Sequence, residues 1–566
     1  MRSYSRDRGV AARRLAPGTA RRIWGFAARY RRQLVWFVLL VVVDALATVA
    51  TPLLFKSLID TAIPQRRLDL VWTIAGVVAA LALIEAVVSL ATRWFSSRIG
   101  EGLIFDLRTA VFDHVQRMPV AFFTRTQTGA LISRLNNDVI GAQQAFTSTL
   151  SGVVSNVIAL VATVGVMLSL SWQITLLSLV LLPVFILPAR GVGGRLQEIT
   201  REGYTLNASM NATMTERFNV AGALLVKLFG RPAEESTSFA DRAGRVRDIG
   251  VLSAMYSRTF FVALTLVASL ATAVVYGVGG HLAITSGLST GTIVALAALL
   301  TRLYGPLTAL SNIRVDVMSA LVSFERVFEI LDLPPMIDEK PGARPLPTGV
   351  RSIEFAAVRF RYPTAEQVSL ASLEDVAVLD SAPSQPVLNG ISFRAEPGQM
   401  VALVGPSGAG KTTISMLPTR MYDVTGGAVR VGGVDVRDVT LQSLRDAIGV
   451  VTQDAHLFHD TIRANLRYAK PDATEDEIAA ALQGAQIWDL VAALPDGLDT
   501  VVGDRGYRLS GGEKQRIAIA RVLLKAPDIV ILDEATAHLD SESEAAVQQA
   551  LKAALAGRTS LVIAHR

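Results

Sequence analysis

The sequence predicts a multidomain membrane protein in which an all-α domain of six transmembrane helices precedes an α/β domain. Hydrophobic residues make up 51% of the 566 residues and charged residues only 18%, whereas soluble proteins carry about 25% charge. Beyond a stretch with five prolines at 332–349, apolar strands alternate with helical segments, as in α/β domains. This composition excludes a disordered or fibrous chain. The absence of cysteine excludes disulfides, zinc–thiolate sites and thiol catalysis.

Six apolar runs are long enough to cross a bilayer, which requires roughly 20 helical residues. They lie near residues 34–55, 70–92, 147–168, 172–189, 259–280 and 288–310. Two long charged segments between them, 96–146 and 190–258, keep helical spacing. We therefore expect membrane helices to continue beyond the bilayer and turn back there, because plain loops of this length are uncommon.

Basic residues predict the orientation of the chain. Residues 1–33 hold ten arginines and loop 96–146 holds five, whereas 56–69 holds three basic residues and 281–289 none. The N-terminal tail and the α/β domain are therefore expected on the cytoplasmic side of the inner (plasma) membrane. Aromatics interleaved with arginines near the end of the tail predict an elbow helix on the anionic inner leaflet. Nucleic-acid binding by the tail is the less favoured alternative.

The α/β domain contains a phosphate-binding pattern. Residues 401–413 read VALVGPSGAGKTT, which is a buried strand, the pattern GxxxxGK[ST] and the start of a helix. Glycines allow several backbone N–H groups to converge on phosphate oxygens, and the helix N-terminus favours the same anion. We expect Lys411 to reach the β- and γ-phosphates and Thr412 to ligate Mg²⁺. The other expected nucleotide contacts are Gly405, Ser407, Gly408, Gly410 and Thr413.

A second apolar strand, IVILDE at 529–534, ends in two acids. Asp533 fits a partner for Mg²⁺, and Glu534 fits a general base for the attacking water. Two acids at a strand end could instead cap a helix, but the phosphate-binding loop favours the catalytic interpretation. The sequence therefore predicts a P-loop nucleoside triphosphatase domain.

Residues 509–515, LSGGEKQ, resemble the signature motif of the ATP-binding-cassette (ABC) proteins, at the usual distance before an ILDE strand. The resemblance implies that Ser510, Gly511 and Gly512 cradle the nucleotide held by a partner cassette. It also implies ATP and Mg²⁺ as cofactors, and a homodimer or heterodimer with a second half-transporter.

The same resemblance assigns roles to residues in order along the chain. Tyr362 is similar to the aromatic residue that stacks on adenine, and Gln453 to the Q-loop residue that senses Mg²⁺ and the membrane domain. Asp540 lies in a segment similar to the D-loop, and His565 is similar to the switch histidine that contacts the γ-phosphate. With Glu534, Gln453 and His565 form the implied catalytic set.

The resemblance extends over nearly the whole chain. Residues 122–138 resemble the first coupling segment of ABC exporters, and residues 215–231 resemble the second. Six spans ahead of one cassette is the half-transporter layout, similar to actinobacterial multidrug and lipid exporters. The implied division is a basic tail at 1–33, a transmembrane domain at 34–328, a linker at 329–349 and a nucleotide-binding domain at 350–566.

Three features depart from the family pattern. The sequence stops at Arg566, directly after the switch histidine, so the cassette is expected to be truncated at its C-terminus. Pro418 falls inside the helix after the phosphate-binding loop, and we expect a kink or an early end that spares the first turn. Residues 364–385 form an insert. It is either a tolerated hairpin extension or a contact surface for the partner cassette or a regulator.

Three charged residues fall within predicted spans: Asp44, Glu85 and Arg302. Intramembrane charges are costly and usually face a partner or a wet cavity. They either line a substrate pathway, where they would bind a cationic group or a proton, or one of the acids pairs with Arg302 as a structural contact. The sequence leaves both alternatives open.

Together these features imply ATP-driven export or flipping of a hydrophobic or amphipathic substrate, such as a lipid, fatty acid, peptide or drug. The nearest alternative keeps the fold and reverses direction, as an importer of lipid or siderophore. An ATP-gated channel or regulatory subunit is a further alternative, but the complete catalytic set argues against it. No nucleic-acid partner is expected.

Overall fold

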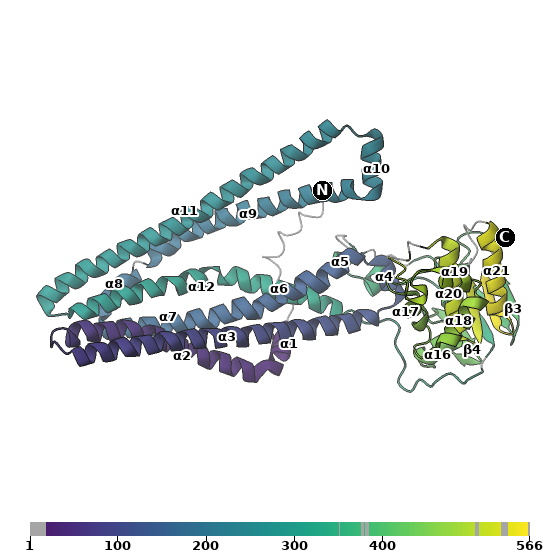
Figure 1. The fold of residues 1–566 in the computed structure, drawn as a ribbon, viewed down its shortest axis with the longest axis horizontal. Helices are drawn as coiled ribbons and strands as arrows, with labels where there is room; N and C mark the ends of the chain where they lie inside the picture. The colour runs from purple at the N-terminus through teal and green to yellow at the C-terminus, as the bar shows by residue number, and fades with distance from the viewer. Residues whose placement is uncertain are drawn as a thin grey trace. The chain divides into compact units, whose positions relative to one another are not determined.

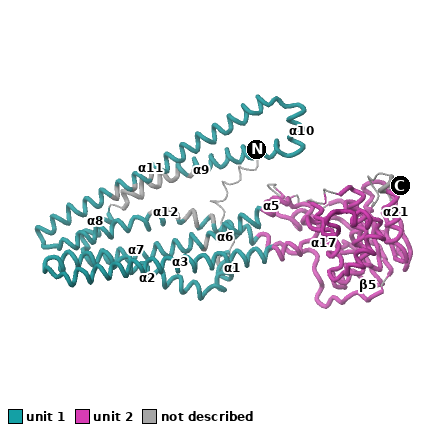
Figure 2. The backbone as a smooth tube through the Cα atoms, in the orientation of Figure 1, with its two compact units in different colours: residues 1–111, 133–328 teal, residues 112–132, 329–566 magenta. Residues whose placement is uncertain are grey.

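The computed structural model describes residues 19–180, 182–349, 351–374, 379, 384–503, 506, 509–533 and 541–563. The chain forms two compact units, coloured separately in Figure 2. Unit 1 comprises residues 1–111 and 133–328, and unit 2 comprises residues 112–132 and 329–566. The short segment 112–132 therefore belongs to unit 2, although helices of unit 1 precede and follow it.

Unit 1 is helical (Figure 1). Its longer helices are α1 (Thr19–Ala27), α2 (Arg31–Ser57), α3 (Leu68–Gln116), α7 (Ser151–Leu170), α8 (Trp172–Val180), α9 (Leu182–Phe218), α10 (Val220–Phe229), α11 (Pro232–Ser286) and α12 (Thr290–Leu331). The shorter pieces are η2 (Ala28–Tyr30), η3 (Leu58–Ala62), η4 (Arg134–Asp138), α6 (Val139–Gln144) and η5 (Ala145–Leu150). Helices α3, α9 and α11 have 49, 37 and 55 residues, more than the roughly 20 that a bilayer requires, so the segments predicted to continue as helices are helical.

Four stretches of the described chain are long and apolar enough to cross a membrane. They are Arg21–Ala62, Leu68–Gln116, Thr128–Leu170 and Thr290–Leu307. They contain the first three predicted spans and most of the sixth. The segments predicted as the fourth and fifth spans are also helical, in α8–α9 and α11, but they are not among these four. Many apolar side chains of the spans are exposed, for example Leu83 and Leu90, as lipid contact requires.

An apolar core joins five helices of unit 1. Buried residues from α2, α7, α8, α11 and α12 form one cluster, which includes Val49, Met167, Ile174, Val275 and Leu300. Large apolar side chains that interlock in this way hold helices together even where lipid supplies no hydrophobic driving force between them.

Asp60 fixes one end of the bundle. Its Oδ1 accepts a hydrogen bond from the backbone N–H of Gly291 at 2.7 Å, and its Oδ2 accepts one from Ser289 Oγ at 2.6 Å. The ammonium of Lys56 lies 3.3 Å from Oδ2. Because Gly291 lies in the first turn of α12, the carboxylate satisfies donors that a helix start leaves free.

The segment predicted as an elbow helix forms α1, which packs on other helices of unit 1. The guanidinium of Arg22 lies 4.2 Å from the ring centroid of Phe328, and Phe26 stacks on the same ring at 6.0 Å. At the end of the elbow, Arg29 and Tyr30 both donate to Asp106 on α3, at 3.3 and 3.2 Å. The elbow is therefore anchored to both α3 and α12.

Unit 2 contains two four-stranded sheets. The antiparallel sheet has the order β2-β1-β4-β5, formed by β2 (Leu388–Ala395), β1 (Ile353–Phe360), β4 (Gly426–Val431) and β5 (Val434–Asp435). The parallel sheet has the order β3-β8-β7-β6, formed by β3 (Met400–Leu403), β8 (Thr559–Ile563), β7 (Ile529–Asp533) and β6 (Ile448–Val451). The two strands predicted beside the phosphate-binding motifs are thus confirmed as β3 and β7.

Helices surround these sheets. They are α4 (Val120–Arg125), α5 (Thr128–Ser133), α13 (Ala365–Val368), α14 (Ala371–Glu374), α15 (Lys411–Met416), α16 (Leu441–Ala447), α17 (Ile462–Arg467), α18 (Glu475–Gly484), α19 (Trp488–Ala493), η6 (Gly497–Asp499), α20 (Gly511–Lys525) and α21 (Ser541–Leu555). One buried cluster joins β7 to α17, α18, α20 and α21. A second cluster lies between the antiparallel sheet, α15 and the other face of the parallel sheet, and it includes Ala121 of α4.

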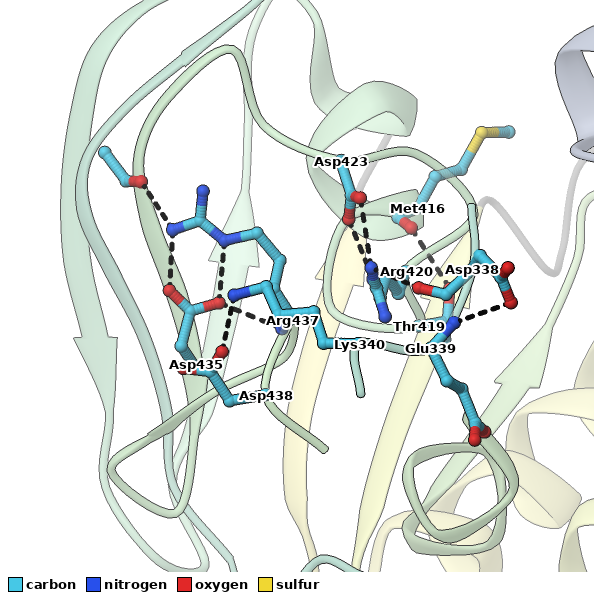
Figure 3. A network of polar contacts seen from close by, with 11 residues as sticks. Asp338, Glu339, Lys340, Met416, Thr419, Arg420, Asp423, Asp435, Arg437 and Asp438 are labelled. Atoms are coloured by element: carbon cyan, nitrogen blue, oxygen red, sulfur yellow. Dashed lines mark hydrogen bonds and ion pairs between the residues drawn. The ribbon is translucent and has the colours of Figure 1, made fainter. Parts of the chain in front are cut away.

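The proline-rich linker is docked on unit 2 by the polar network in Figure 3. Arg420 is 5% exposed and donates to the carbonyl of Asp338 at 3.0 Å, while its Nε donates to Asp423 at 2.9 Å. The ammonium of Lys340 lies 2.6 Å from Asp438. The linker is therefore fixed within unit 2. The residue that holds it, Arg420, follows α15, the helix after the predicted phosphate-binding loop.

Candidate nucleotide-binding site

The predicted phosphate-binding loop joins β3 to α15. Gly408 and Gly410 adopt φ values of +80° and +86°, which side chains rarely tolerate. A Cβ at position 410 would also lie 2.9 Å from Leu388 Cδ2. Gly405, Ser407 and Gly408 are exposed, so the loop is accessible to a ligand. Backbone curvature, close packing and accessibility fit a cradle for phosphate oxygens.

Lys411 lies inside this loop. Its Nζ donates to the carbonyl oxygens of Gly405 and Pro406, at 2.7 and 3.1 Å. Thr412 is exposed, whereas Thr413 is buried. Helix α15 ends at Met416, two residues before Pro418, so the predicted early end is confirmed and the first turn is retained.

Strand order gathers the other predicted phosphate-side residues at one edge. Because β3, β8, β7 and β6 are parallel, the loop after β3, the end of β7 and the segment after β6 lie at the same sheet edge. Asp533 is the last residue of β7 and is 9% exposed. Gln453 follows β6 and is exposed.

The donor set at this edge fits Mg²⁺. The hydroxyl of Thr412, the carboxylate of Asp533 and the amide of Gln453 all offer oxygen, the ligand that Mg²⁺ prefers. Within the described ranges, three or more His, Cys, Asp or Glu side chains nowhere converge as a metal cluster. Mg²⁺ commonly takes one or two protein ligands together with phosphates of the nucleotide.

Tyr362 lies next to the phosphate-binding loop. Its hydroxyl is 2.8 Å from Thr413 Oγ1. Its ring packs edge-to-face on Phe360 at 5.0 Å and on Tyr422 at 5.3 Å. Such pairs hold the ring in a defined orientation. The structure thus brings the predicted adenine-stacking residue to the loop predicted to hold the phosphates.

The signature segment begins α20. Ser510 caps the helix: its Oγ accepts from Glu513 N at 3.3 Å, and the Glu513 carboxylate accepts from Ser510 N at 2.7 Å. Ser510 and Gly511 are exposed, and Gly512 is buried. The exposed start of this 15-residue helix offers backbone donors to an anion.

Two residues of α20 support the segment after β6, and sequence reasoning missed both. Gln515 donates to the carbonyl of Thr452 at 3.2 Å. Arg521 donates to the backbone carbonyls of Asn465 and His456, each at 2.7 Å, and burial lowers the pKa of its guanidinium. These partners lie 56 and 65 positions away in the chain, so only the folded structure reveals them.

Three predicted residues lie outside the described part of the chain. They are Glu534, Asp540 and His565. The strands that lead into Glu534 and His565, β7 and β8, are adjacent and in register, with Asp533 opposite Ile563. The roles of these three residues stay predictions.

The first predicted coupling segment packs on the cassette within unit 2. Ala121 and Phe122 of α4 are 4% and 0% exposed. The backbone N–H of Gln127 donates to the carbonyl of Leu373 at 3.1 Å. Leu373 belongs to the insert, whose described part includes α13 and α14. The insert thus contacts a loop of its own chain, a partner that the sequence did not suggest.

The second predicted coupling segment contains α10, between α9 and α11. Its apolar residues are exposed: Val220 is 89%, Leu224 56%, Leu228 63% and Phe229 79% exposed. Asn219 caps the helix by accepting a hydrogen bond from Gly222 N at 2.7 Å. A short, well-formed helix with an uncovered apolar surface is typical of a docking element.

The predicted intramembrane charges lie on three helices. Arg302 of α12 donates to the backbone carbonyl of Thr48 on α2. Asp44 on α2 and Glu85 on α3 are intermediate in exposure. Among the described residues, Arg302 forms no ion pair with either acid, so the predicted structural pairing is not observed.

Comparison with known proteins gives the same assignment for both units. Residues 34–307 match the family described as the ABC transporter transmembrane region, and residues 388–537 match the family described as ABC transporter. The lipid A-core flippase of Thiobacillus denitrificans is 34% identical over 97% of this chain and 92% of that protein. Bacillus subtilis YgaD, named provisionally for multidrug export, is 33% identical over the same shares.

A solved structure agrees over nearly the full length. The ATP-bound structure of a bacterial Atm1-family ABC exporter has a TM-score of 0.75 and 28% identity, and the match covers 95% of this chain and 91% of that one. Phosphate-binding loop, signature helix and parallel-strand order occur here in that fold. The chain therefore belongs to the ABC transporter family, as an exporter-type half-transporter that couples ATP hydrolysis to export or flipping through a multi-pass membrane domain.

Proposed function

We propose that the chain acts as a dimer that moves a hydrophobic or amphipathic molecule, such as a lipid, fatty acid, peptide or drug. Relatives named for lipid A-core flipping and multidrug export support this substrate class. The helices also expose mainly apolar side chains, and the apolar bundle offers few groups that would bind a sugar or an ion. Homodimer and heterodimer are both compatible with the complete set of catalytic residues.

The exposed apolar surface of α10 is the observation that best supports a dimer. A helix with Val220 and Phe229 about four-fifths or more exposed requires a cover in a functional assembly. The segment resembles the second coupling segment of exporters, and a groove on the partner's cassette would cover it. The start of α20 would in turn face the nucleotide held by that partner.

Each residue of the nucleotide site has its own proposed role in ATP binding or hydrolysis. Lys411 and the backbone of Gly408 and Gly410 hold the phosphates of ATP, and Tyr362 orients the adenine. Mg²⁺, when bound by Thr412 and Asp533, neutralises phosphate charge. Glu534 accepts the proton of the attacking water, Gln453 and His565 respond to the γ-phosphate, and Asp540 contacts the partner across the dimer.

The cytoplasm is the proposed location of the cassette and the N-terminal tail, with the helices in the inner membrane. The arginine-rich tail leads into α1, whose Arg22 and Arg29 lie near the predicted bilayer surface. Positive charge of this kind favours the cytoplasmic leaflet. The domain boundaries predicted at 34–328, 329–349 and 350–566 belong to the same proposal.

Asp44 and Glu85 are proposed to line the substrate pathway. Asp44→Asn and Glu85→Gln remove charge but keep shape, so we expect ATP hydrolysis to persist while transport of a cationic drug falls several-fold. Circular dichroism and the thermal midpoint monitor folding. Loss of folding without a selective transport defect would instead indicate a structural role.

Reconstitution of the full chain in liposomes tests the proposed function. Added lipids or drugs that are transported should raise the ATPase rate, and Glu534→Gln should abolish hydrolysis while nucleotide binding persists. Lys411→Ala should weaken ATP binding, whereas Lys470→Ala, on an exposed surface pair with Glu477, should leave it unchanged. ATP consumption with no lipid or drug moved or flipped would contradict the proposal.

A further inference from the structure

The insert after Tyr362 begins with two short, buried helices. Thr364 caps α13 in a reciprocal capping box with Gln367. Val368 and Leu373 are 2% and 0% exposed, and Ser369 is 1% exposed. A loosely tolerated hairpin would leave such residues in solvent. Residues 364–374, which we call the insert clamp, therefore form a packed part of unit 2.

The insert clamp contacts the short connection between α4 and α5. The carbonyl of Leu373 accepts from the backbone N–H of Gln127 at 3.1 Å. One residue further on, Glu374 accepts from Arg125 at two points, with Nε–Oε1 at 2.9 Å and Nη2–Oε2 at 3.5 Å. The Glu374 side chain is only 12% exposed. A two-point arginine–carboxylate pair that is partly shielded from water fixes geometry more strongly than an exposed pair.

The other side of α4 leads toward the phosphate-binding loop. Ala121 of α4 and Tyr422 belong to the same buried apolar cluster. The Tyr422 ring packs on Tyr362, and the Tyr362 hydroxyl is 2.8 Å from Thr413. Because the two rings are packed against each other, we expect a shift of Tyr362 on nucleotide binding to move the Tyr422 ring and α4 as well.

The insert starts and ends at the same tyrosine. Only Pro363 separates Tyr362 from the cap of α13, and Ser384 near the insert's far end donates to the Tyr362 carbonyl at 2.5 Å. The insert clamp contacts segment 119–127. This segment directly follows α3, a single helix over Leu68–Gln116. The insert clamp thus joins the adenine side of the nucleotide site to a loop at the end of a membrane helix.

We propose that the insert clamp is a coupling element, in which Glu374 and Arg125 are positioning residues that keep segment 119–127, with helix α4, aligned with Tyr362 during the ATP cycle. The proposal rests on the transport function proposed above and goes beyond it, because it assigns a role to a segment outside the catalytic motifs. Neither residue belongs to the predicted nucleotide-binding motifs.

Hydrogen exchange on the full chain in lipid nanodiscs tests the clamp without any transported ligand. In a Glu534→Gln background, ATP with Mg²⁺ should slow exchange of peptides covering 119–127, because the Gln127 amide is held by Leu373. Glu374→Arg should raise exchange there at least about fivefold and remove the effect of ATP. Glu354→Arg is the control, since Glu354 pairs with Arg430 at 3.2 Å between β1 and β4. Equal exchange in Glu374→Arg and the control would overturn the proposal.

The second measurement is the coupling ratio, which is the amount of lipid moved per ATP hydrolysed. We expect Arg125→Glu and Glu374→Arg each to retain at least half of the ATPase kcat, with an unchanged KM for ATP. Movement of a nitrobenzoxadiazole-labelled phosphatidylethanolamine per ATP should fall at least fivefold. The double charge swap should restore most of it. Equal losses of ATPase and lipid movement, or no rescue by the swap, would refute the clamp. If the unmodified chain hydrolyses ATP but moves no lipid, the transport proposal fails, and hydrogen exchange still decides the clamp.

Discussion

Tyr362 illustrates how a single side chain combines packing and binding. The sequence identified it by resemblance alone, since an aromatic residue after a strand is usually part of the core. In the structure its ring packs on Phe360 and Tyr422, and its hydroxyl lies 2.8 Å from Thr413 of α15, while its role in binding adenine stays a prediction. The two functions of the residue are therefore separable by substitution.

Two substitutions of Tyr362 should have different effects on ATP binding. Tyr362→Phe keeps the ring and loses one hydrogen bond of about 1 kcal/mol, so the KM for ATP should rise no more than about fivefold. Tyr362→Ala also loses stacking on the base, which contributes about 1–3 kcal/mol, so the KM should rise at least about tenfold. Steady-state ATPase measurements distinguish them. Equal effects of Phe and Ala would mean that the ring does not contact the base.

At the scale of elements, short-range and long-range polar contacts fix the segments around the site. Strand β5 and the turn after it are held by Arg437, which donates to Asp435 through Nη2 at 2.7 Å and through Nε at 3.0 Å. Burial by itself would raise the pKa of Asp435, but the hydrogen bonds from Arg437 lower it below the usual 3.8. Figure 3 shows this pair beside the docked linker.

The Asp435 pair predicts a pH-dependent stability. Because the pKa is lower in the folded chain, its stabilising effect is fully present above the unfolded value and is lost as pH falls through the folded value. At pH 7, Arg437→Ala should lower the thermal midpoint by about 2–4 °C, equivalent to about 1 kcal/mol for this partly exposed pair. Below about pH 4 the difference from the unmodified chain should shrink.

A control for this prediction is Arg394→Ala. Arg394 pairs with Glu396 at 2.9 Å, but both side chains are more than half exposed. Exposed pairs contribute little, so its thermal midpoint should stay unchanged at both pH values. If the thermal midpoint of Arg437→Ala stays below that of the unmodified chain by the same amount from pH 7 to pH 3, the prediction is wrong. The substitution would then remove a packing contribution that does not depend on the ionised Asp435.

At the scale of the whole molecule, the dimer proposal concerns α10, whose exposed apolar surface we propose is covered by the cassette of a partner chain. Leu224→Glu with Leu228→Glu places charge on its exposed apolar surface, where both side chains are more than half exposed. The fold should be unaffected, but burying these charges against a partner is costly. Loss of an interface hot spot of 2 kcal/mol or more should reduce ATPase activity at least about tenfold.

Cross-linking in lipid and the ATPase rate measure this effect, and Tyr204→Glu on α9 is the control. Tyr204 is 73% exposed and lies outside the resemblance to a coupling segment. The control should retain both dimer and activity. If the α10 variant retains them as well, another surface must carry the assembly.

The sequence by itself determined the features that depend on short stretches of chain. The phosphate-binding loop requires glycine at two left-handed positions and lysine at the helix start, and all of these lie within Gly405–Lys411. The apolar spans and the strand ending in Asp533 are equally local. Such patterns can be recognised in the sequence because residues adjacent in the chain determine the local backbone conformation.

Only the tertiary structure decided the contacts between distant segments. Arg125 and Glu374 are 249 positions apart, and nothing in either neighbourhood indicates that they meet. The hydroxyl contact of Tyr362 with Thr413 and the support of the Q-loop segment by Arg521 are likewise products of strand order. Pairing across a sheet or between helices depends on how all elements pack at once, so no local pattern encodes it.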